Sequence, residues 1–367
     1  MKLKLRDIGP LRLAALGVTT SVGSTVAEVV AHLGAMQAQD YLGALWSIGL
    51  RLPGVTEADV EAAIAERTIV RTWPMRGTLH FVAAEDVRWM LKLMTPRILS
   101  GSAARHRQLE LDEAVFARSE KLIVRELKDG RVRTREELFA LLERSKIDPA
   151  GQRGIHILSK LAMEGVICFG PRAGKQPTFV LLDDWLSVTR TLDHEAALVE
   201  IARRYFTSHG PATLADFERW TGLKITDARK GLEVIKDTLV QYTMGEDVYW
   251  MAEPGSAGKA RSGKVHLLPG FDEFLLGYKD RSAVVPAEQA HRIVPGGNGM
   301  FMPTMVSKGQ VTGMWNRELK GKRVLVDMKP FLAGTTAQGN AFVKEARLYA
   351  KFLGKEAVFS AARAGES

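Results

Sequence analysis

The sequence contains a single cysteine, Cys168, among its 367 residues. One cysteine cannot form an internal disulfide, and it cannot build a cysteine-rich zinc or iron–sulfur site. No run approaches the roughly 20 apolar residues of a membrane span. The first residues, Met1 to Asp7, carry too many charges for the apolar segment of a signal peptide. These absences lead us to expect a protein of the reducing cytoplasm.

Signature motifs of several large enzyme classes are missing as well. The sequence has no Gly-x-x-x-x-Gly-Lys phosphate loop, no His-Glu-x-x-His zinc motif and no Gly-x-Ser-x-Gly nucleophile turn. Its eight histidines are scattered without the spacing of metal ligands. We therefore expect neither a metal site nor a cofactor.

The composition describes a globular protein with a basic surface. Apolar residues make up 46% and charged residues 25% of the chain, enough for two or three domains with real cores. The 51 lysines and arginines outnumber the 42 acids, which leaves a net charge of +9. Such a charge favours an anionic partner, with nucleic acid preferred over a membrane surface.

A pattern of three short helices followed by a β-hairpin recurs three times, which is typical of winged helices. The clearest copy has an apolar helical stripe over 195–208, a helix that opens at Thr213, and a third helix from about Thr226. Two alternating strands follow between 239 and 251, around the turn Gly245-Glu246-Asp247.

The other two copies are less regular. In the second, Thr134 and Glu137 form a capping box, in which each side chain satisfies a free backbone donor, and wing strands are expected at 165–170 and 178–182. The first copy spans 10–83, with a helix opening at Thr56 and a wing over 69–82.

The chain after Val265 has a different pattern. Short β-like runs predict a small sheet or barrel, closed by a helix from about Gln338 to Phe352. We therefore predict an α+β fold with three tandem winged helix-turn-helix motifs and a C-terminal β-rich, barrel-like element. The predicted domains are 1–95, 96–190, 191–260 and 261–367.

Four stretches of the sequence resemble a known family. They are Met36-Gln37-Ala38-Gln39-Asp40, Leu45-Trp46-Ser47 with Arg51, Val70 to His80, and Leu267 to Arg281. Together they resemble the winged-helix DNA glycosylases of the AlkZ/YcaQ type, and the resemblance covers nearly the whole chain. In that family a Gln-apolar-Gln motif marks the AlkZ branch and a Gln-apolar-Asp motif the YcaQ branch. The form seen here implies removal of alkylated purines, particularly guanines alkylated at N7, including those in interstrand crosslinks.

The residues themselves are compatible with this chemistry. Alkylation at N7 makes guanine cationic and hence a good leaving group, so the enzyme mainly has to orient a water and stabilise a cationic sugar. Gln37 and Gln39 are the predicted catalytic residues, because in extended backbone their side chains fall on one side and two amide oxygens can hold one water. Asp40 is either an electrostatic contributor or a helix cap. The alternative for the two glutamines is an ordinary polar helix end.

Candidate DNA contacts lie first on the predicted first wing. Arg71, Arg76 and His80 alternate there with Thr72, Met75 and Leu79, and both arginines are expected to contact phosphate. Alternatively, an arginine pairs with a carboxylate such as Asp40 or Glu66, and His80 is a packed histidine. For Trp73, a core position is preferred over stacking on a nucleotide.

A second set of candidate contacts is a cluster of basic residues between Arg97 and Arg135, here called the basic stripe. Sequence-independent phosphate contacts of this kind dominate non-specific DNA affinity. The predicted contacts within it are Arg105, Arg107, Arg131 and Arg133; the remaining members are Arg97, Arg118, Lys121, Arg125, Lys128 and Arg135. The alternative is a solvated helix face whose cations pair with Glu120 or Glu126. Lys308, beside Gly309 at a predicted hairpin tip, is a further candidate for a groove contact.

The sequence thus predicts a monofunctional, monomeric DNA glycosylase of base excision repair in the cytoplasm, associated with the nucleoid and acting on duplex DNA that contains alkylated purines. Two alternatives remain. A winged-helix transcription regulator would bind specific sequences, although three fused copies remove the need for dimeric symmetry. A lesion-binding relative without turnover would share the basic surface.

Overall fold

The computed structural model describes residues 3–187, 189–253, 261, 264–297 and 299–359. Its internal contacts divide the chain into two compact units. The first unit comprises 1–60, 199–220 and 224–367, and the second comprises 61–198 and 221–223. The four predicted domains stay a prediction, since these units group the chain differently and the predicted boundary at 260 lies outside the described residues.

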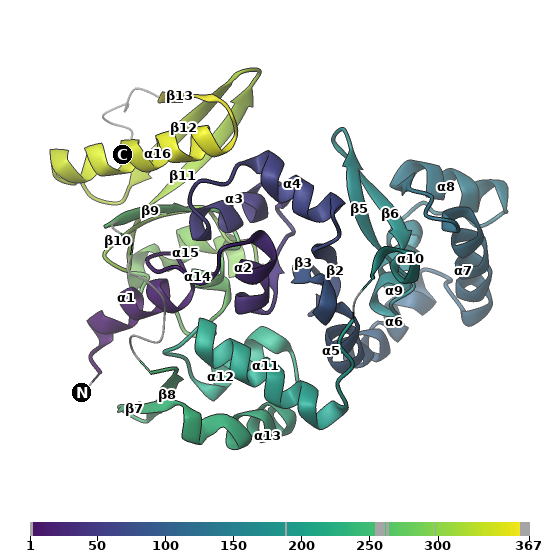
Figure 1. The fold of residues 1–367 in the computed structure, drawn as a ribbon, viewed down its shortest axis with the longest axis horizontal. Coiled ribbons are helices and arrows are strands. Elements are labelled where there is room, and N and C mark those ends of the chain that lie inside the picture. The colour runs from purple at the N-terminus through teal and green to yellow at the C-terminus, as the bar shows by residue number, and fades with distance from the viewer. Residues whose placement is uncertain (1–2, 188, 254–260, 262–263, 298, 360–367) are drawn as a thin grey trace. The chain divides into compact units, whose positions relative to one another are not determined.

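The predicted order of helices and hairpins is present three times along the chain (Figure 1). The first series is α2 (Val26–Leu33), α3 (Tyr41–Arg51), α4 (Glu57–Ala65), β2 (Ile69–Met75) and β3 (Thr78–Ala83). The second is α7 (Glu113–Leu127), α8 (Arg135–Arg144), α9 (Arg153–Met163), β5 (Ile167–Ala173) and β6 (Gln176–Leu181). The third is α11 (His194–Ser208), α12 (Leu214–Thr221), α13 (Ile225–Ile235), β7 (Val240–Met244) and β8 (Asp247–Met251). The assignment of each series as a winged helix stays a prediction.

Local signals place the ends of several of these elements. The Thr134 Oγ1 accepts a hydrogen bond from Glu137 N at 3.2 Å, and the Glu137 carboxylate accepts one from Thr134 N at 2.7 Å, so the predicted capping box is confirmed. Thr56 and Asp59 make the same reciprocal pair at the start of α4. The turn between β7 and β8 contains Gly245 with a φ of +63°, a conformation that glycine adopts without strain.

The second unit is built on antiparallel strands in the order β3, β2, β5, β6 and β4 (Arg133–Thr134). Helices α5 (Val87–Gly101), α6 (Ala103–Gln108) and α10 (Leu182–Trp185) complete it. Trp73 from β2 is 6% exposed and packs on Phe169 of β5 with ring centroids 5.0 Å apart. Leucines of α7, α8 and α9 belong to the same apolar cluster. The core position predicted for Trp73 is therefore confirmed.

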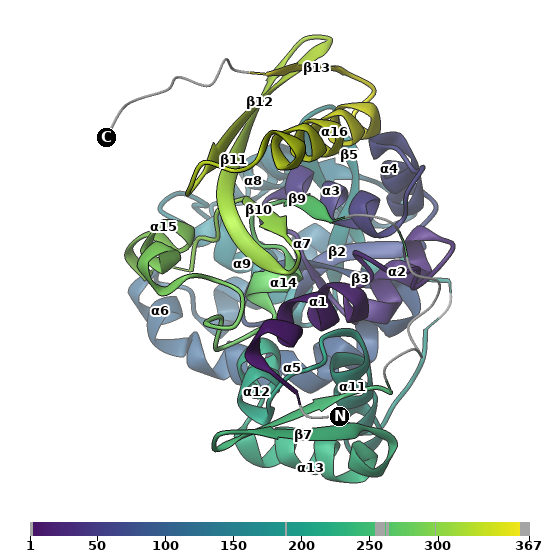
Figure 2. The same cartoon turned by 90° about the vertical axis from the view of Figure 1, so that its left-hand side faces the viewer.

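The first unit contains the C-terminal sheet. Its strand order is β13 (Glu356–Phe359), β12 (Arg323–Pro330), β11 (Gln310–Lys320), β10 (Thr304–Ser307) and β9 (Val265–Leu268). Neighbouring strands are antiparallel except β12 and β13, and the sheet curls strongly along β11 (Figure 2). This curled half-barrel matches the predicted barrel-like element.

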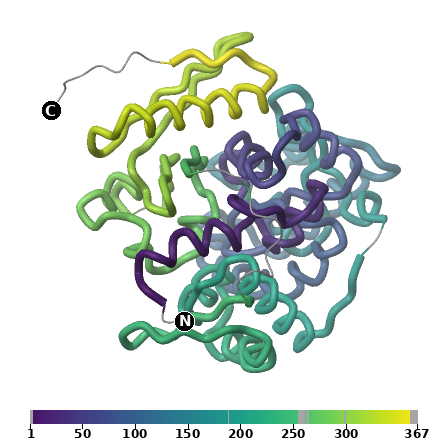
Figure 3. Tube along the Cα trace, turned by 60° about the vertical axis from the view of Figure 1, so that its left-hand side comes forward, coloured from purple at the N-terminus to yellow at the C-terminus, as the bar shows by residue number. Residues whose placement is uncertain are grey.

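Helix α16 (Thr336–Phe352) closes this sheet, as Figures 2 and 3 both show. Its Tyr349 ring lies 5.1 Å from the Trp46 ring and 5.2 Å from the Trp315 ring. The predicted closing helix from about Gln338 to Phe352 is confirmed with its start two residues earlier.

Short elements complete the first unit: α1 (Leu5–Ala15), β1 (Met36–Gln37), α14 (Glu273–Leu276) and α15 (Ala290–Ile293). Within the described ranges, none of the helices has the length and apolar character needed to cross a membrane. The same residues contain no group of three or more histidine, cysteine or acidic side chains arranged to hold a metal ion.

Candidate active site around Gln37

The Gln-x-Gln motif lies in the short extended segment between α2 and α3. Helix α2 opens with a capping box between Thr25 and Glu28 and ends at Gly34, whose φ of +77° favours glycine. A Cβ built on Gly34 would meet the Trp220 ring at 3.5 Å, so the chain passes close to α12 before it enters β1. The backbone then runs through Gln37 to Asp40, where α3 begins.

The two glutamines differ in their surroundings. Gln37 is 7% exposed, whereas Gln39 is exposed. The Gln37 Oε1 accepts a hydrogen bond from Gln39 N at 3.0 Å. Strand β1 ends at Gln37, so the regular alternation that would place both side chains on one face does not extend to Gln39. A carboxamide oxygen has two lone pairs, so Gln37 Oε1 retains capacity for a second donor such as water.

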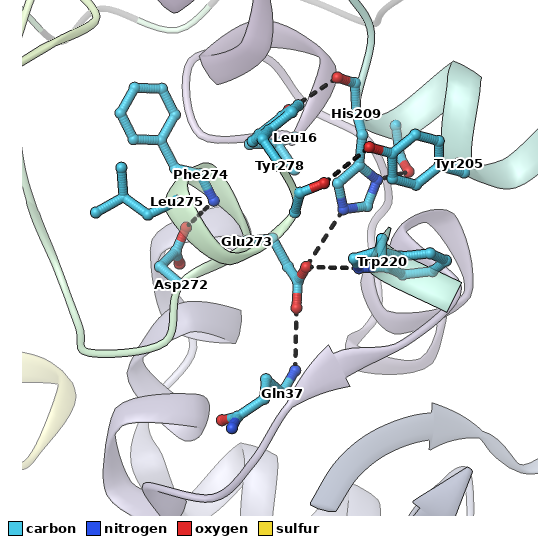
Figure 4. A network of polar contacts seen from close by, with 12 residues as sticks. Leu16, Gln37, Tyr205, His209, Trp220, Asp272, Glu273, Phe274, Leu275 and Tyr278 are labelled. Atoms are coloured by element: carbon cyan, nitrogen blue, oxygen red, sulfur yellow. Dashed lines mark hydrogen bonds and ion pairs between the residues drawn. The ribbon is translucent and has the colours of Figure 1, made fainter. Parts of the chain in front are cut away.

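A buried carboxylate holds the backbone of Gln37. Glu273, which is 1% exposed, accepts a hydrogen bond through Oε1 from Gln37 N at 3.1 Å (Figure 4). Its Oε2 accepts one from Trp220 Nε1 at 2.9 Å and lies 3.4 Å from His209 Nε2. A buried carboxylate is costly unless hydrogen bonds satisfy it. Its position therefore depends on groups brought together from β1, from the residue that follows α11, and from α12.

The residue before Glu273 anchors the same turn. Asp272 receives two hydrogen bonds from the Arg51 guanidinium, at 2.9 and 3.0 Å, and one from Ser47 Oγ at 2.7 Å. It also caps α14 through Phe274 N at 3.0 Å. Burial raises the pKa of Asp272, but the Arg51 charge and these hydrogen bonds outweigh it and hold the pKa below its ordinary value. Asp272 is therefore an ionised anchor between α3 and α14.

Aromatic side chains enclose His209 beside this carboxylate. The Tyr205 ring stacks on the His209 ring with centroids 4.7 Å apart and an angle of 13° between the planes. Tyr278 donates its hydroxyl proton to the His209 carbonyl at 2.8 Å, and Tyr205 donates to the Gly277 carbonyl at 2.7 Å. These contacts hold the His209 ring in one orientation against Glu273.

The long stretch from Leu267 to Arg281 thus has a structural role next to Gln37. At its start, strand β9 accepts hydrogen bonds from two tryptophan side chains. Trp46 donates to the Leu267 carbonyl at 2.8 Å, and Trp315 donates to the Leu268 carbonyl at 2.8 Å. Sequence reasoning singled out this stretch but assigned no role to Glu273. The available signal was an acidic pair inside an apolar run, since such carboxylates are seldom buried without a purpose.

Asp40 acts as a helix cap. Its Oδ1 accepts a hydrogen bond from Gly43 N at 3.1 Å, and both carboxylate oxygens lie 2.8 Å from Arg317 Nη2. The structural alternative for Asp40 is therefore present. The arginine that pairs with it is Arg317 of β11, whereas a wing arginine was one alternative considered from the sequence.

A family model of AlkZ-like DNA glycosylases matches residues 30–352. The chain belongs to this family. A curated relative, the interstrand DNA cross-link repair glycosylase of Streptomyces sahachiroi, is 28% identical over 339 residues, which cover 86% of this chain and 88% of the relative. The solved structure of Streptomyces sahachiroi DNA glycosylase AlkZ superposes with a TM-score of 0.77 at 24% identity, covering 98% of this chain and all of that one. The resemblance read from the sequence is confirmed.

In this AlkZ-like chain, the wing residues are more enclosed than the sequence suggested. His80 is fully buried; its Nδ1 lies 2.9 Å from the Thr78 carbonyl, and its Nε2 lies 3.1 Å from Arg76 Nη2. The imidazole is thus a packed group that orients Arg76, and it does not reach the surface of the second unit. Arg71 lies over the Phe169 ring at 4.7 Å. Phosphate contact by Arg71 and Arg76 stays a prediction.

Most of the basic stripe is exposed, and its hydrogen bonds go largely to neutral oxygens. Arg105 donates to the side chains of Gln108 and Gln152, and Arg131 donates to the carbonyls of Lys128 and Arg125. Such bonds orient a guanidinium without neutralising its charge. Arg133 differs, because it pairs with Glu126 at 2.7 Å, as the solvated-face alternative anticipates for that carboxylate. Arg107 is exposed at the end of α6.

The predicted hairpin tip at Lys308 and Gly309 is confirmed as the turn between β10 and β11. Its backbone packs on α1, since a Cβ built on Gly309 would meet the Pro10 backbone nitrogen at 2.4 Å. Gly309 is therefore committed to a contact inside the first unit. The exposed Lys308 side chain remains the candidate for contact with DNA.

Proposed function

We propose that this protein is a monofunctional DNA glycosylase that hydrolyses the N-glycosidic bond of cationic N7-alkylated purines in duplex DNA. The observation that carries the proposal is the arrangement at the motif. Gln37 is held on its backbone by the buried Glu273 and on its side chain by Gln39 N, while the Gln39 side chain is exposed. One amide that is held in position beside a second, exposed amide supports a role for both in orienting a water.

The chemistry asks little of such a site beyond positioning. Departure of a cationic purine neutralises the base and leaves positive charge on the sugar, so no strong general acid is required. A water that donates to the oxygens of Gln37 and Gln39 would be oriented toward the anomeric carbon. The products are the free alkylated base, an apurinic site and a proton, which the attacking water releases to solvent. Because neither amide is a strong base, normal purines should be spared.

The surface charge supports action on DNA. Exposed arginines of the basic stripe, such as Arg105 and Arg131, present guanidinium groups whose hydrogen bonds go to neutral oxygens. Cations of this kind bind phosphates without regard to sequence. The proposal includes three winged helices as the DNA-binding scaffold and a monomeric protein, since three fused modules supply an extended interface without dimerisation.

We include N7-linked interstrand crosslinks among the substrates. The Streptomyces sahachiroi relative is named for crosslink repair, and at 28% identity over 86% of this chain the comparison supports a related substrate. A crosslinked guanine carries the same cationic N7 as a methylated one. The same hydrolytic step therefore applies to both.

The experiment measures base release from a duplex with one N7-methylguanine under single-turnover conditions. The variants are Gln37→Ala, Gln39→Ala and the matched control Gln338→Ala, which removes a carboxamide from α16. Each is used above its own dissociation constant for the duplex. We expect both motif variants to lose on the order of 100-fold in rate, the typical cost of misplacing a reacting group, and the control to match the wild type.

A duplex with a defined N7-linked crosslink provides the second substrate. Release from methylguanine but not from the crosslink would restrict the proposal to monoadducts. Tight binding of both duplexes without base release would support the lesion-binding alternative. Preference for one unmodified sequence over others would instead favour a regulator.

A further inference from the structure

The hydrogen bonds of Ser208 determine which nitrogen of His209 carries a proton. Ser208 Oγ lies 2.7 Å from the Arg204 carbonyl oxygen, which can only accept. The single hydroxyl proton is therefore used in that bond. Ser208 Oγ also lies 2.7 Å from His209 Nδ1. Because the hydroxyl has no second proton to give, His209 Nδ1 must be the donor in this contact.

A neutral imidazole protonated on Nδ1 has a bare lone pair on Nε2. In this structure Nε2 faces Glu273 Oε2 at 3.4 Å, and a carboxylate oxygen is also an acceptor. Both side chains are buried, His209 at 0% and Glu273 at 1% exposure. Two facing lone pairs in a buried site repel each other. One additional proton between Nε2 and Oε2 removes the conflict.

We propose that His209 and Glu273 share one buried proton and that this proton makes Glu273 a positioning residue for Gln37. The inference rests on the proposed function for its effect on catalysis, but not for the proton itself. An imidazolium with a carboxylate and an imidazole with a carboxylic acid have the same number of protons. In either form Oε1 accepts from Gln37 N, and Oε2 lies within reach of both Trp220 and His209 (Figure 4).

Charged and titratable groups from several elements of the first unit lie near the pair. Those that face His209 are Arg12 of α1, His32 of α2, Arg51 of α3, Tyr205 of α11 and Tyr278 after α14. Burial is the main cause of a lowered pKa for His209, with the two arginines acting in the same direction, while the Glu273 hydrogen bond and charge oppose it. Glu273 is thus the group that favours a proton on the His209 ring, whereas burial and the two arginines disfavour it.

Loss of this proton to solvent as pH rises breaks one hydrogen bond in the network. Either Glu273 withdraws from the bare Nε2, or the Ser208 hydroxyl turns to Nδ1 and the imidazole proton moves to Nε2. The second response gives up the bond to the Arg204 carbonyl. The first loosens the carboxylate that holds Gln37 N. Base release should therefore fall as pH rises through the apparent pKa of the pair.

The proton is tested directly by the ¹⁵N chemical shifts of the His209 ring in the full chain at neutral pH, assigned by comparison with His209→Gln. The expected result is a protonated Nδ1, with Nε2 either protonated or accepting a proton. A bare Nε2, or a neutral ring with its proton on Nε2 and a bare Nδ1, would overturn the proposal. This measurement does not use base release, so it tests the shared proton independently of the proposed function.

The link to Gln37 is tested by the pH profile of single-turnover base release from N7-methylguanine duplex. Wild type is compared with Ser208→Ala and with Ser119→Ala, a control in which a buried serine loses a similar bond, to the Val115 carbonyl at 2.8 Å, with no imidazole attached. In Ser208→Ala, Nδ1 is no longer obliged to donate, and a neutral ring with its proton on Nε2 satisfies Glu273.

We expect the rates of wild type and Ser119→Ala to fall by up to about tenfold per pH unit above the apparent pKa of the pair, as for loss of one essential proton. In Ser208→Ala the fall should move upward by at least about one pH unit, which corresponds to the same tenfold change. Superimposable profiles for Ser208→Ala and wild type would refute the link between the pair and Gln37.

Discussion

Two histidines in different units show how one ring can have opposite proton requirements. In the second unit, His80 Nδ1 faces the Thr78 carbonyl at 2.9 Å, and Nε2 faces the Arg76 guanidinium at 3.1 Å. In the first unit, His209 Nδ1 faces Ser208 Oγ, and Nε2 faces the Glu273 carboxylate. Both rings donate through Nδ1. At Nε2, His80 meets a donor and needs no further proton, whereas His209 meets an acceptor and needs one.

A third histidine, His266, lies near a carboxylate but beyond hydrogen-bonding distance. His266 Nδ1 and Glu345 Oε2 lie 4.0 Å apart between β9 and α16. Burial lowers the pKa of His266 to about 4 and raises the pKa of Glu345 to about 7. Near pH 6, between these two values, His266 is therefore a neutral imidazole and Glu345 is a neutral carboxylic acid. The 4.0 Å separation leaves no hydrogen bond between His266 and Glu345, in contrast to the 3.4 Å contact of His209 with Glu273.

The largest expected effect concerns the buried ion pair of Arg51 and Asp272, which lies beside Glu273 in the first unit. Arg51→Leu leaves the Asp272 carboxylate buried without its cation, which should lower the free energy of unfolding by about 3–5 kcal/mol. The control Arg203→Leu removes a pair with Glu200 in which Arg203 is 54% exposed, and it should cost less than about 1 kcal/mol. Urea unfolding at neutral pH measures both.

The stability that this ion pair contributes depends on pH. The pKa of Asp272 in the folded state is lowered, so its ion pair contributes stability above the unfolded pKa and loses it as pH falls through the folded value. The difference in the free energy of unfolding between wild type and Arg51→Leu should therefore become smaller at acidic pH. A gap independent of pH would mean that the loss comes from packing of the arginine side chain and not from its charge.

An intermediate effect is expected at the His266 and Glu345 pair. Because the folded pKa of Glu345 is raised to about 7, wild type loses stability as pH rises from the unfolded value toward about 7. Glu345→Gln lacks this group, so its stability relative to wild type should increase over that interval by up to about 3 kcal/mol, at 1.36 kcal/mol per pKa unit. Urea unfolding at about pH 5 and about pH 8 compares the two proteins. An equal difference at both values would contradict an independently titrating Glu345.

The smallest expected effect concerns Arg76, which His80 contacts, and the salt dependence of DNA binding. If Arg76 contacts a phosphate, Arg76→Gln should reduce the salt dependence of duplex binding by about one unit of slope. His80→Leu removes the group that orients Arg76 and should produce part of the same change. Arg203→Gln changes the net charge equally at a residue already paired with Glu200 and serves as the control. Binding titrations across a range of salt concentrations distinguish them; equal slopes for Arg76→Gln and Arg203→Gln would remove Arg76 from the interface.

Local features of the fold were predictable because their causes lie within a few residues. The reciprocal bonds of Thr134 and Glu137 span three positions, and the turn at Gly245 depends on a short glycine-containing sequence between alternating strands. The start of α16 and the core position of Trp73 follow in the same way from periodicity and residue type. None of these requires knowledge of distant segments.

The candidate site was only half predictable. Gln37 and Gln39 were recognised from a motif of three residues, but Glu273 lies 236 positions from Gln37, and Trp220 lies 53 positions from Glu273. For Asp40, the sequence offered a wing arginine as one alternative partner, whereas the structure pairs it with Arg317 on β11, 277 positions away. Side-chain type indicates what a residue can bond, and says nothing about which distant partner the packing supplies.

By itself, the sequence determined the order of helices and hairpins, their caps, the basic charge and the family motif, since these follow from the spacing and chemistry of neighbouring residues. The tertiary structure alone decided that Gln37 is buried while Gln39 is exposed, that a carboxylate holds Gln37 N, and that this carboxylate meets the acceptor side of His209. The physical reason is that burial and hydrogen-bond direction at these groups depend on elements brought together from across the first unit.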